Sequence, residues 1–499
     1  MPAHPEHVDV LIVGAGLSGV GAAAHLQDEC PGATWAILEA RDAIGGTWDL
    51  FRYPGIRSDS DMFTLGYAFR PWTDTTAIAD GGTIREYVRD AARERGIDRA
   101  VRFGHRVVAA DWSSATARWT VTAENDAGPV TFTCGFLFFC AGYYRYDRGH
   151  EPALPGAEEF VGRVVHPQHW PVDLDCTGQR VVVVGSGATA VTLVPALAET
   201  AAHVTMLQRS PSYVLSLPAR DPLATRLFAR VPARLAAPVV RAKNVAMTTL
   251  VYRLSRRFPA WMRQRLLDGV RAQLPAGFPV DEHFAPAYDP WDQRLCIVPD
   301  GDLFRAVREG RASVVTDRIA TLTRHGVALE SGTEVPADVV VTATGLSLQM
   351  LGGATLRVDG REVDLARTVA YRGAMLSGVP NLGLTLGYTN ASWTLRADLV
   401  ATYVCRLLRY LRTHDQAVVT PVDPPTVDLA PLIGLRSGYV RRATALLPRQ
   451  GSSGPWRLRQ SYPHEMLTLR HGRIDDGYLR FAPAPTPSPT PATAGRGAA

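Results

Sequence analysis

A glycine-rich segment near the start of the chain constrains the fold more than any other feature of the sequence. Gly14, Gly16 and Gly19 form the motif GAGLSG, which follows the apolar run Val8–Val13 and is followed by a second such run, Thr34–Leu38. The first glycine permits a tight strand-to-helix turn, the second lets a pyrophosphate approach the backbone, and the third lets the helix pack closely on the strand. Unpaired N–H groups at the helix N-terminus then attract phosphate. The segment predicts a βαβ unit that binds a dinucleotide.

An acidic residue just after the second apolar run indicates which dinucleotide binds at the first glycine motif. Glu39 stands twenty residues after Gly19. A carboxylate at this place accepts hydrogen bonds from ribose hydroxyls and repels a 2′-phosphate. We therefore assign the first motif to FAD.

The same pattern returns about one domain later in the chain. The motif GSGATA follows the run Val181–Val184 and precedes the run His203–Leu207. A repeated βαβ start indicates two nucleotide-binding domains. The residues that we assign to the second dinucleotide are Gly185, Ser186, Gly187, Ala188, Thr189, Ala190, Arg209 and Ser210.

The second site has a different residue at the selectivity position. The run His203–Leu207 is followed by Gln208, Arg209 and Ser210, and none of these is acidic. An arginine pairs with a 2′-phosphate, so this site should prefer NADPH to NADH. FAD and NADPH together predict an oxidoreductase.

The expected fold class is α/β, with two Rossmann-like dinucleotide-binding domains, one for FAD and one for NADPH. We expect the FAD domain to comprise residues 1–150 and 346–481, and the NADPH domain to comprise residues 151–345. Helical spacing of apolar residues broken by prolines predicts a helical insertion at about 213–290. The alternating stretch 314–345 predicts short β-hairpins that lead into a buried strand. Residues 482–499 are rich in Pro, Ala and Thr, which predicts a disordered tail.

Cysteine usage and charge exclude several classes of protein. The six cysteines have no CxxC spacing and no accompanying histidine cluster, so we expect no disulfide framework, no metal site and a cytoplasmic location. Cys134 and Cys140 flank a predicted strand, Phe132–Cys140, and we expect packing roles for them, which weighs against a disulfide reductase. The net charge of +5 is small for 499 residues and gives no reason to expect a nucleic-acid partner.

The segment between the two motifs resembles a known family signature. FVGRVVHPQHWP is similar to the FxGxxxHxxxWP signature of type I Baeyer–Villiger monooxygenases, with Phe160, Gly162, His166, Trp170 and Pro171 all in place. The resemblance continues in GGTW, YPGIRSD, an ATG strand end and GYTNASWTLRAD, and covers the chain except its tail. Within the family the sequence looks most similar to the ethionamide-activating group.

The resemblance implies a two-stage reaction. NADPH reduces FAD, O2 then forms a C4a-peroxyflavin, and this attacks a ketone to give an ester or lactone. The same species can oxygenate thioethers or thiocarbonyls. The alternative is a flavin-containing monooxygenase that oxygenates nitrogen or sulfur without Baeyer–Villiger activity, and a third interpretation is a protein that only senses the NADPH redox state.

The resemblance also implies roles for particular residues. Arg294, in the segment DQRLCIVPDGDLF, would stabilise the anionic oxygen. Asp59 of YPGIRSD would orient the guanidinium of Arg294 and lie beside the flavin. Gln293 replaces a lysine that many members have before this arginine, so we expect a less strict preference for NADPH. The residues that the resemblance places near the flavin or the bound nicotinamide are Gly46, Thr47, Trp48, Thr389, Asn390, Ser392 and Trp456.

Two segments keep two interpretations each. The resemblance places His166 and Trp170 in a linker between domains, where a hinge or gating role and a structural role both fit. Residues 220–271 contain twelve Lys or Arg but only Asp221 and Asp268 as acids. This segment is either a lid over the substrate site with a solvated basic face or a surface for peripheral contact with a membrane.

Overall fold

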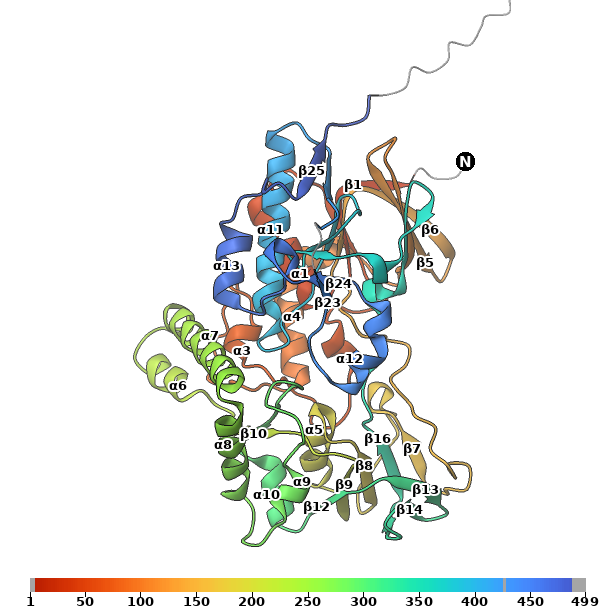
Figure 1. Ribbon diagram of the computed structural model, residues 1–499, viewed down its shortest axis with the longest axis vertical. Helices are drawn as coiled ribbons and strands as arrows, with labels where there is room; N and C mark the ends of the chain where they lie inside the picture. Colours follow the sequence, from red (N-terminus) through yellow and green to blue (C-terminus); the bar gives the residue numbers. More distant parts are fainter. Residues whose placement is uncertain (1–4, 425–427, 487–499) are drawn as a thin grey trace, which may run out of the picture.

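The computed structural model describes residues 5–424 and 428–486, and within them the chain forms two α/β units that follow one another along the long axis of the molecule (Figure 1). Strands from both ends of the chain build the upper unit in this view, and strands from its middle build the lower one. The predicted βαβ start is present in each unit.

The larger sheet has the strand order β18-β17-β4-β5-β6-β1-β2-β3, with β21 also paired to β6. Its parallel part, β3, β2, β1 and β6, carries the first glycine motif at the end of β1. Strands β4, β5 and β6 form an antiparallel meander that extends the sheet. The strand bounds are β1 Glu6–Val13, β2 Trp35–Leu38, β3 Val101–Arg102, β4 Arg106–Ser113, β5 Arg118–Asn125, β6 Gly128–Phe139, β17 Thr355–Val358, β18 Arg361–Glu362 and β21 Leu382–Leu384.

Helices from both halves of the chain cover the parallel part of this sheet. The glycine-motif helix α1 packs along α11, and α13 packs on the outer side of α11. Contacts between these helices join the two sequence segments that build the larger unit. The helix bounds are α1 Leu17–Glu29, α2 Thr47–Leu50, α3 Met62–Leu65, α4 Gly81–Glu94, α11 Trp393–Thr413, α12 Gly438–Ala443 and α13 Tyr462–Arg470.

The smaller sheet is parallel throughout, in the order β12-β9-β8-β16-β7. Its central strands are continuous runs of Val, as expected for strands buried on both faces. The bounds are β7 Arg163–Val165, β8 Arg180–Val184, β9 His203–Gln208, β12 Ala312–Thr316 and β16 Val339–Thr342, with helices α5 Ala188–Leu197 and α10 Asp302–Arg308 packed against them.

Two sequence expectations for this unit need correction. The first strand of the stretch 314–345, β12, pairs in parallel with β9, because it is the return strand of a crossover. Only β13 Ile319–Thr323, β14 Gly326–Leu329 and β15 Glu334–Pro336 form the expected antiparallel hairpins. The segment expected to be helical from 213 begins instead with a strand, β10 Val214–Leu217, which pairs with β11 Cys296–Pro299.

The helices of the insertion are α6 Pro222–Phe228, α7 Ala233–Arg257, α8 Pro259–Arg271 and α9 Val280–His283. In Figure 1 α6 and α7 project from the left side of the molecule, level with the junction between the two units. The remaining strands form small pairs: β19 Ala370–Tyr371 with β20 Met375–Leu376, β22 Val418–Pro421 with β25 Leu479–Ala482, and β23 Leu429–Pro431 with β24 Arg449–Gly451.

The expected tail falls only partly within the structure. Ala482 is the last residue of β25, paired with Val418, so the sequence boundary lay inside a strand. Residues 487–499 lie outside the described residues. All six cysteines are buried, and the burial of Cys134 and Cys140 agrees with the packing roles expected for them. Among the described residues no helix combines the length and the apolar character needed to cross a membrane.

A partly buried histidine joins the two halves of the larger unit. His25 on α1 contacts Glu29 through Nδ1 and Asp398 on α11 through Nε2, both at 2.9 Å. Burial lowers its pKa, but hydrogen bonds to Asp398 and Glu29 raise it more, and the result is a pKa of about 9. The charged imidazolium therefore links α1 to α11.

This linkage predicts a pH-dependent stability. The stabilisation is complete below the unfolded pKa of 6.5 and is lost as pH rises through 9, because the folded state binds the proton more tightly. We expect His25→Gln to lower the free energy of unfolding by on the order of 2 kcal/mol near pH 6.5 and by much less at pH 10. Urea unfolding of both proteins at the two pH values measures this; an equal difference at both would contradict it.

Candidate functional site

A single large cavity of about 1270 Å³ lies between the two units and is lined by both glycine motifs. Gly14, Gly16 and Glu39 contribute from the larger unit, and Gly185 and Gly187 from the smaller one. The carboxyl ends of the parallel strands of both sheets therefore open on one space, which is where α/β sheets bind their ligands.

The first motif has the backbone that its sequence predicts. Gly14 has φ +103°, and a Cβ atom there would lie 2.9 Å from the carbonyl oxygen of Cys140. A Cβ atom on Gly19 would lie 1.8 Å from the carbonyl oxygen of Gly14, so only glycine lets α1 pack this closely; Gly19 itself lies beneath the cavity and does not line it. Gly16 approaches Gly46 of the GGTW segment, where a Cβ atom would lie 3.5 Å from the Gly46 Cα.

Glu39 faces the cavity although it is almost fully buried. Its carboxylate accepts hydrogen bonds from the backbone N–H groups of Ala15 at 2.6 Å and Arg41 at 2.9 Å. Burial raises the pKa of Glu39, while these two hydrogen bonds act in the opposite direction. The carboxylate is thus fixed beside the glycine turn, at the position suited to a ribose.

The second motif offers open space where a phosphate would lie. Gly185 has φ +144°, and a Cβ atom there would lie 2.4 Å from the Ala343 carbonyl oxygen. A Cβ atom on Gly187 would meet nothing within 4 Å and would project into the cavity at the start of α5. Ser186 Oγ donates a hydrogen bond to the Ser210 carbonyl at 2.9 Å, which ties the motif to the end of β9. Ala188 and Thr189 line the cavity, whereas Ala190 is buried beneath it.

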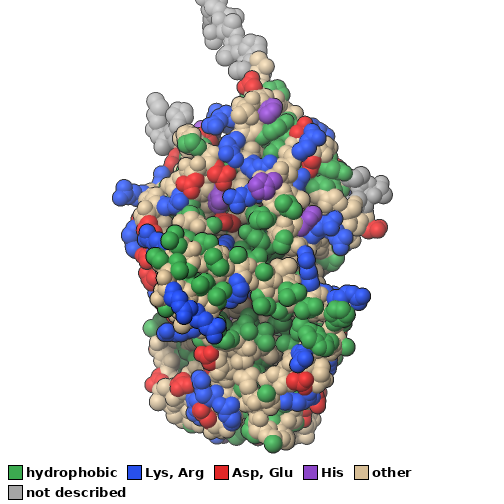
Figure 2. All heavy atoms as spheres, turned by 90° about the vertical axis from the view of Figure 1, so that its left-hand side faces the viewer, with side chains coloured by type: hydrophobic (Ala, Val, Ile, Leu, Met, Phe, Trp, Pro, Cys, Tyr) green, Lys and Arg blue, Asp and Glu red, His purple; other side chains and the backbone are tan. Residues whose placement is uncertain are grey.

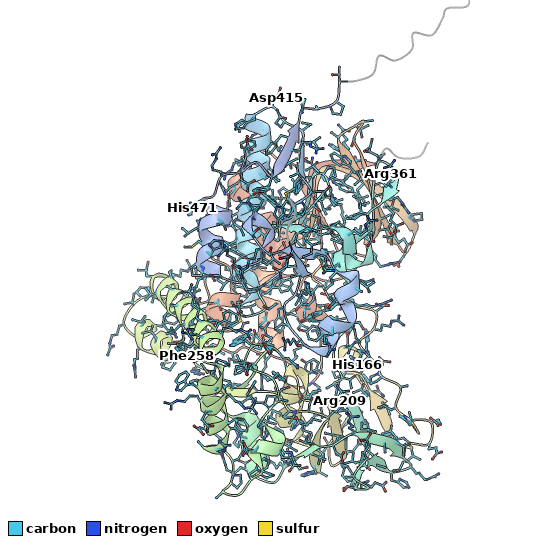
Figure 3. All side chains as sticks on the ribbon, in the orientation of Figure 1. His166, Arg209, Phe258, Arg361, Asp415 and His471 are labelled. Carbon is cyan, nitrogen blue, oxygen red and sulfur yellow. The ribbon has the colours of Figure 1, made fainter. Side chains whose placement is uncertain are left out.

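Arg209 is exposed on the wall of this cavity (Figure 3) and makes no ion pair within the described part of the chain. Sequence reasoning missed a second cation here. Arg318 also lines the cavity, and it follows β12, which pairs with β9 up to Gln208. Gln293 lines the same cavity. The strand pairing that brings residue 318 next to residue 209 is a tertiary feature, and no motif marks it.

Arg294 and Asp59 meet in the cavity as the resemblance implied. Arg294 Nε lies 2.6 Å from Asp59 Oδ2, and Nη2 donates a hydrogen bond to Asp59 Oδ1 at 2.9 Å. Burial lowers the pKa of Arg294, but the charge of Asp59 and three tyrosines raise it well above its usual range. The guanidinium is therefore a permanent cation in a fixed orientation.

Those three tyrosines were not anticipated from the sequence. Tyr143, Tyr144 and Tyr439 all line the cavity, and the hydroxyls of the first two lie 3.3 Å apart. Tyr143 also stacks on Trp393, with ring centroids 5.2 Å apart. Burial raises the pKa of all three phenols, so each hydroxyl stays protonated and can donate a hydrogen bond. The run YYRY after β6 was the available signal for Tyr143 and Tyr144.

The GGTW segment lies on the cavity wall, with Gly46, Thr47 and Trp48 all lining it. Thr47 Oγ1 lies 3.4 Å from the Tyr146 hydroxyl. Buried Asp49 fixes the segment, because it accepts hydrogen bonds from Arg41, Arg52 and Arg89.

The segment 389–392 borders a second, smaller cavity. Tyr388 and Trp393 line the large cavity, but Asn390 and Ser392 line a second cavity of about 560 Å³ that also contacts α7; Thr389 lines neither. Gln460 holds this segment: its side-chain oxygen accepts from the Thr389 N–H at 3.0 Å, and its carbonyl oxygen accepts from Asn390 Nδ2 at 2.9 Å. Asn390 Oδ1 and the Ser392 and Thr394 hydroxyls are buried without hydrogen-bond partners. The polar edge of a bound ring would supply such partners.

The signature between the two units contributes no cavity wall. Phe160 is buried, and a Cβ atom on Gly162 would lie 2.2 Å from the Asp338 carbonyl oxygen. His166 follows β7; its Nδ1 accepts from the Gln168 N–H at 3.2 Å, its Nε2 is buried without a partner, and burial lowers its pKa. Trp170 packs on the core of the smaller sheet, and Pro171 follows it.

Two contacts of the signature bear on its role. Gln168 Nε2 donates to the carbonyl oxygens of Arg145 and Tyr146 at 2.8 and 3.0 Å, which ties the signature to the tyrosine run. Figure 3 shows His166 at the junction of the two units. These contacts fit a joint between the units, so a hinge role stays a prediction.

One expected cavity residue is placed wrongly by the sequence reasoning. Trp456 is 1% exposed and packs edge-on against Tyr371, with ring centroids 5.3 Å apart. It does not line the large cavity. The ring instead fills the core between α11, α13 and the C-terminal strands, and a lone tryptophan near the end of the chain carries no signal that distinguishes the two positions.

The two cavity arginines make a testable prediction about coenzyme choice. Arg209→Ala should lower kcat/KM for NADPH about tenfold to a hundredfold, with little change for NADH, because a charge-assisted hydrogen bond to the 2′-phosphate is lost. Arg318→Ala should give a smaller loss, and the double variant should lose the preference. Steady-state kinetics with both coenzymes measures this. Arg324→Ala, on the exposed hairpin, is the control; an unchanged ratio in Arg209→Ala would refute the assignment.

Comparisons with known proteins agree with this site. Residues 67–267 match the family described as flavin-binding monooxygenase-like, and residues 12–77 match an NAD(P)-binding Rossmann-like domain. The chain is 55% identical over 479 residues to the FAD-containing monooxygenase EthA of Mycobacterium tuberculosis, which covers 96% of this chain and 98% of EthA. It is 45% identical over 480 residues to the probable FAD-binding monooxygenase AlmA of Acinetobacter baylyi, covering 95% and 96%.

The fold is also that of a monooxygenase of known structure. A structure of oxidised steroid monooxygenase bound to NADP superimposes with a TM-score of 0.74 at 23% identity, covering 96% of this chain and all of that one. The predicted fold class, with two dinucleotide-binding domains, and the predicted cofactors FAD and NADPH are confirmed. The chain therefore belongs to the family of FAD-containing monooxygenases, which are oxidoreductases.

Proposed function

We propose that the protein is a Baeyer–Villiger monooxygenase that inserts one oxygen atom of O2 into a ketone to give an ester or lactone. We also propose that it oxygenates the sulfur of thioethers or thiocarbonyls. The observation that carries the proposal is the Arg294 guanidinium, held by Asp59 on two hydrogen-bonding sites in the cavity between the glycine motifs.

The residues present fit both cofactors. Gly14, Gly16 and Glu39 would hold the pyrophosphate and a ribose of FAD, with Trp48 and the unpartnered polar atoms near Asn390 at the flavin ring. Gly187 and Arg209 would hold the phosphates of NADPH. When bound and reduced, the flavin supplies the activation of O2; the protein supplies binding, orientation and charge.

Arg294 performs the electrostatic part of the reaction. Oxygen attack on a ketone places negative charge on oxygen atoms that were neutral before. A cation that is already oriented stabilises this charge without reorganisation, and in many enzymes such stabilisation lowers the barrier more than any other single effect. Asp59 provides the orientation, because a carboxylate that contacts both Nε and Nη2 fixes the plane of the guanidinium.

The tyrosines beside Arg294 give the substrate site its character. Their phenols stay neutral, so they add hydroxyl donors without charge, and their rings present apolar surface to an uncharged substrate. A wall of this kind also limits water around the reacting oxygen. We infer that the substrate is a neutral, largely apolar carbonyl or sulfur compound.

Product analysis tests the proposal. FAD-loaded enzyme with NADPH should convert a panel of linear, cyclic and aryl ketones to esters or lactones, and an aryl thioether to its sulfoxide. Sulfoxide without any ester would refute the Baeyer–Villiger assignment and favour the nitrogen- or sulfur-oxygenating alternative.

Arg294 itself gives a sharper prediction. Arg294→Ala should lower kcat for ester formation by about a hundredfold or more, since one oriented charge at the developing anion is lost. Arg294→Lys should recover part of this activity, because it restores charge but not the two-point contact with Asp59. Arg180→Ala, which removes the ion pair with Asp338 on the smaller unit, is the control. FAD content measured by absorbance shows whether each variant is loaded. Full ester formation by loaded Arg294→Ala would contradict the role.

A further inference from the structure

The outer face of the helical insertion is apolar, although its hydrophobic residues do not line the large cavity. Six large hydrophobic side chains on this face are each between 48% and 70% exposed. They recur at helical spacing on α7 and continue across the α7–α8 junction: Leu235, Val239, Met247, Leu250, Phe258 and Trp261. Ala242 and Ala246 fill the same stripe and are also exposed. A helix pair inside a protein would bury such a stripe.

The opposite face of α7 is firmly attached to the molecule. Arg241 Nη1 donates to the carbonyl oxygens of Phe63 and Gly66, and Asn244 Nδ2 donates to Asp61 Oδ1. Arg256 donates to Asp292 at 2.8 Å. These contacts hold α7 against the rest of the molecule, so the exposed stripe lies on the outer face of a packed helix.

Charge surrounds this stripe with one sign. Residues 222–267 contain ten Lys or Arg and no Asp or Glu. Six of these arginines make neither an ion pair nor a side-chain hydrogen bond with another described residue: Arg226, Arg230, Arg234, Arg253, Arg257 and Arg265. Arg257 lies over the ring of Phe258, and Arg265 over the ring of Trp261. In Figure 2 hydrophobic and basic side chains intermix across the middle of the face that carries α6, α7 and α8, with few acidic ones.

We propose that this surface, the outer face of α7 and the start of α8, docks on an anionic lipid surface. Hydrophobic side chains that project between arginines match a bilayer interface, where acyl chains accept the former and lipid phosphates the latter. Tryptophan and phenylalanine beside arginine suit the headgroup level. The segment that forms this surface has no acidic residue between Asp221 and Asp268, so charge complementarity favours a negative, extended partner over a second copy of this chain.

The docking surface also touches the elements that hold the site. Arg256 and Tyr252 of α7 contact Asp292 and Trp291, which immediately precede Gln293 and Arg294. The inner face of α7 lines the second cavity together with Asn390 and Ser392. A docked enzyme would thus have its substrate site close to the lipid surface, which suits an apolar substrate.

Vesicle flotation tests the proposal with the full-length, FAD-loaded enzyme. The enzyme should float with vesicles of phosphatidylcholine containing about 30% phosphatidylglycerol, because the clustered arginines are attracted to anionic lipid. It should remain at the bottom with pure phosphatidylcholine vesicles, and added salt should weaken the binding. Failure to bind the anionic vesicles would overturn the proposal.

Two sets of variants locate the contact. Leu235→Gln/Leu250→Gln/Trp261→Gln removes apolar anchors, and Arg234→Gln/Arg257→Gln/Arg265→Gln removes charges that make no ion pair. Each should weaken partitioning, the second by roughly a hundredfold if each arginine acts independently near the surface. The matched controls are Val172→Gln/Leu446→Gln/Leu467→Gln, also exposed apolar residues, and Arg118→Gln/Arg324→Gln/Arg361→Gln; Figure 3 shows Arg361 far from Phe258.

Three further outcomes decide between explanations. Equal flotation of the test and control variants would show a nonspecific effect of charge and overturn the proposal. A wild-type oligomer that becomes monomeric in the apolar variant, by light scattering, would also overturn it, because the face would then join copies of the chain. Unchanged NADPH oxidation by all variants without vesicles supports it, since these residues lie outside the catalytic cavity.

Discussion

The contact between Arg294 and Asp59 is the interaction on which the arrangement of the site depends. The arginine comes from the unit that carries the second glycine motif, and the carboxylate from the unit that carries the first. Neither sheet alone could place a cation between two dinucleotides. A second ion pair, Arg57 with Asp302, spans the same junction at 2.5 Å. One short segment, YPGIRSD, thus anchors the two units to each other and supplies the residue that orients the cation.

The Arg294–Asp59 pair keeps its charges although it is partly removed from water. A guanidinium keeps its charge even when partly removed from water, and a carboxylate that takes two of its N–H groups compensates the desolvation. The surrounding phenols stay neutral because burial raises their pKa. At Arg294 the cavity therefore presents a permanent positive charge, oriented by Asp59, beside polar but uncharged phenols. This distribution suits a neutral substrate on which negative charge develops during the reaction.

The helical insertion connects the site to the outside of the molecule. Its inner residues contact the loop before Arg294, and its outer residues form the proposed docking surface. Long helices with an outward apolar stripe are uncommon on water-facing surfaces, because exposed apolar patches tend to mark contact sites. The two interpretations of the basic segment, lid and membrane contact, are compatible in the structure, since the two faces of α7 differ.

Local rules account for what the sequence could establish. Glycine turns, valine-rich strands and the contrast between Glu39 and Arg209 depend on residues close together in the chain, so both βαβ units and both cofactors could be predicted. Hairpins at 314–345 and a helix from 213 were wrong in part, because β12 and β10 pair with strands far away in sequence.

Only the tertiary structure decided which distant residues share the cavity. Arg318 lies beside Arg209 through strand pairing, Gln460 holds the 389–390 segment from seventy residues away, and three tyrosines surround Arg294. Trp456 shows the converse, since its ring packs into the core although its sequence position suggested the cavity. Sequence patterns encode the local backbone and the alternation of burial, whereas a site between two units depends on how their surfaces meet.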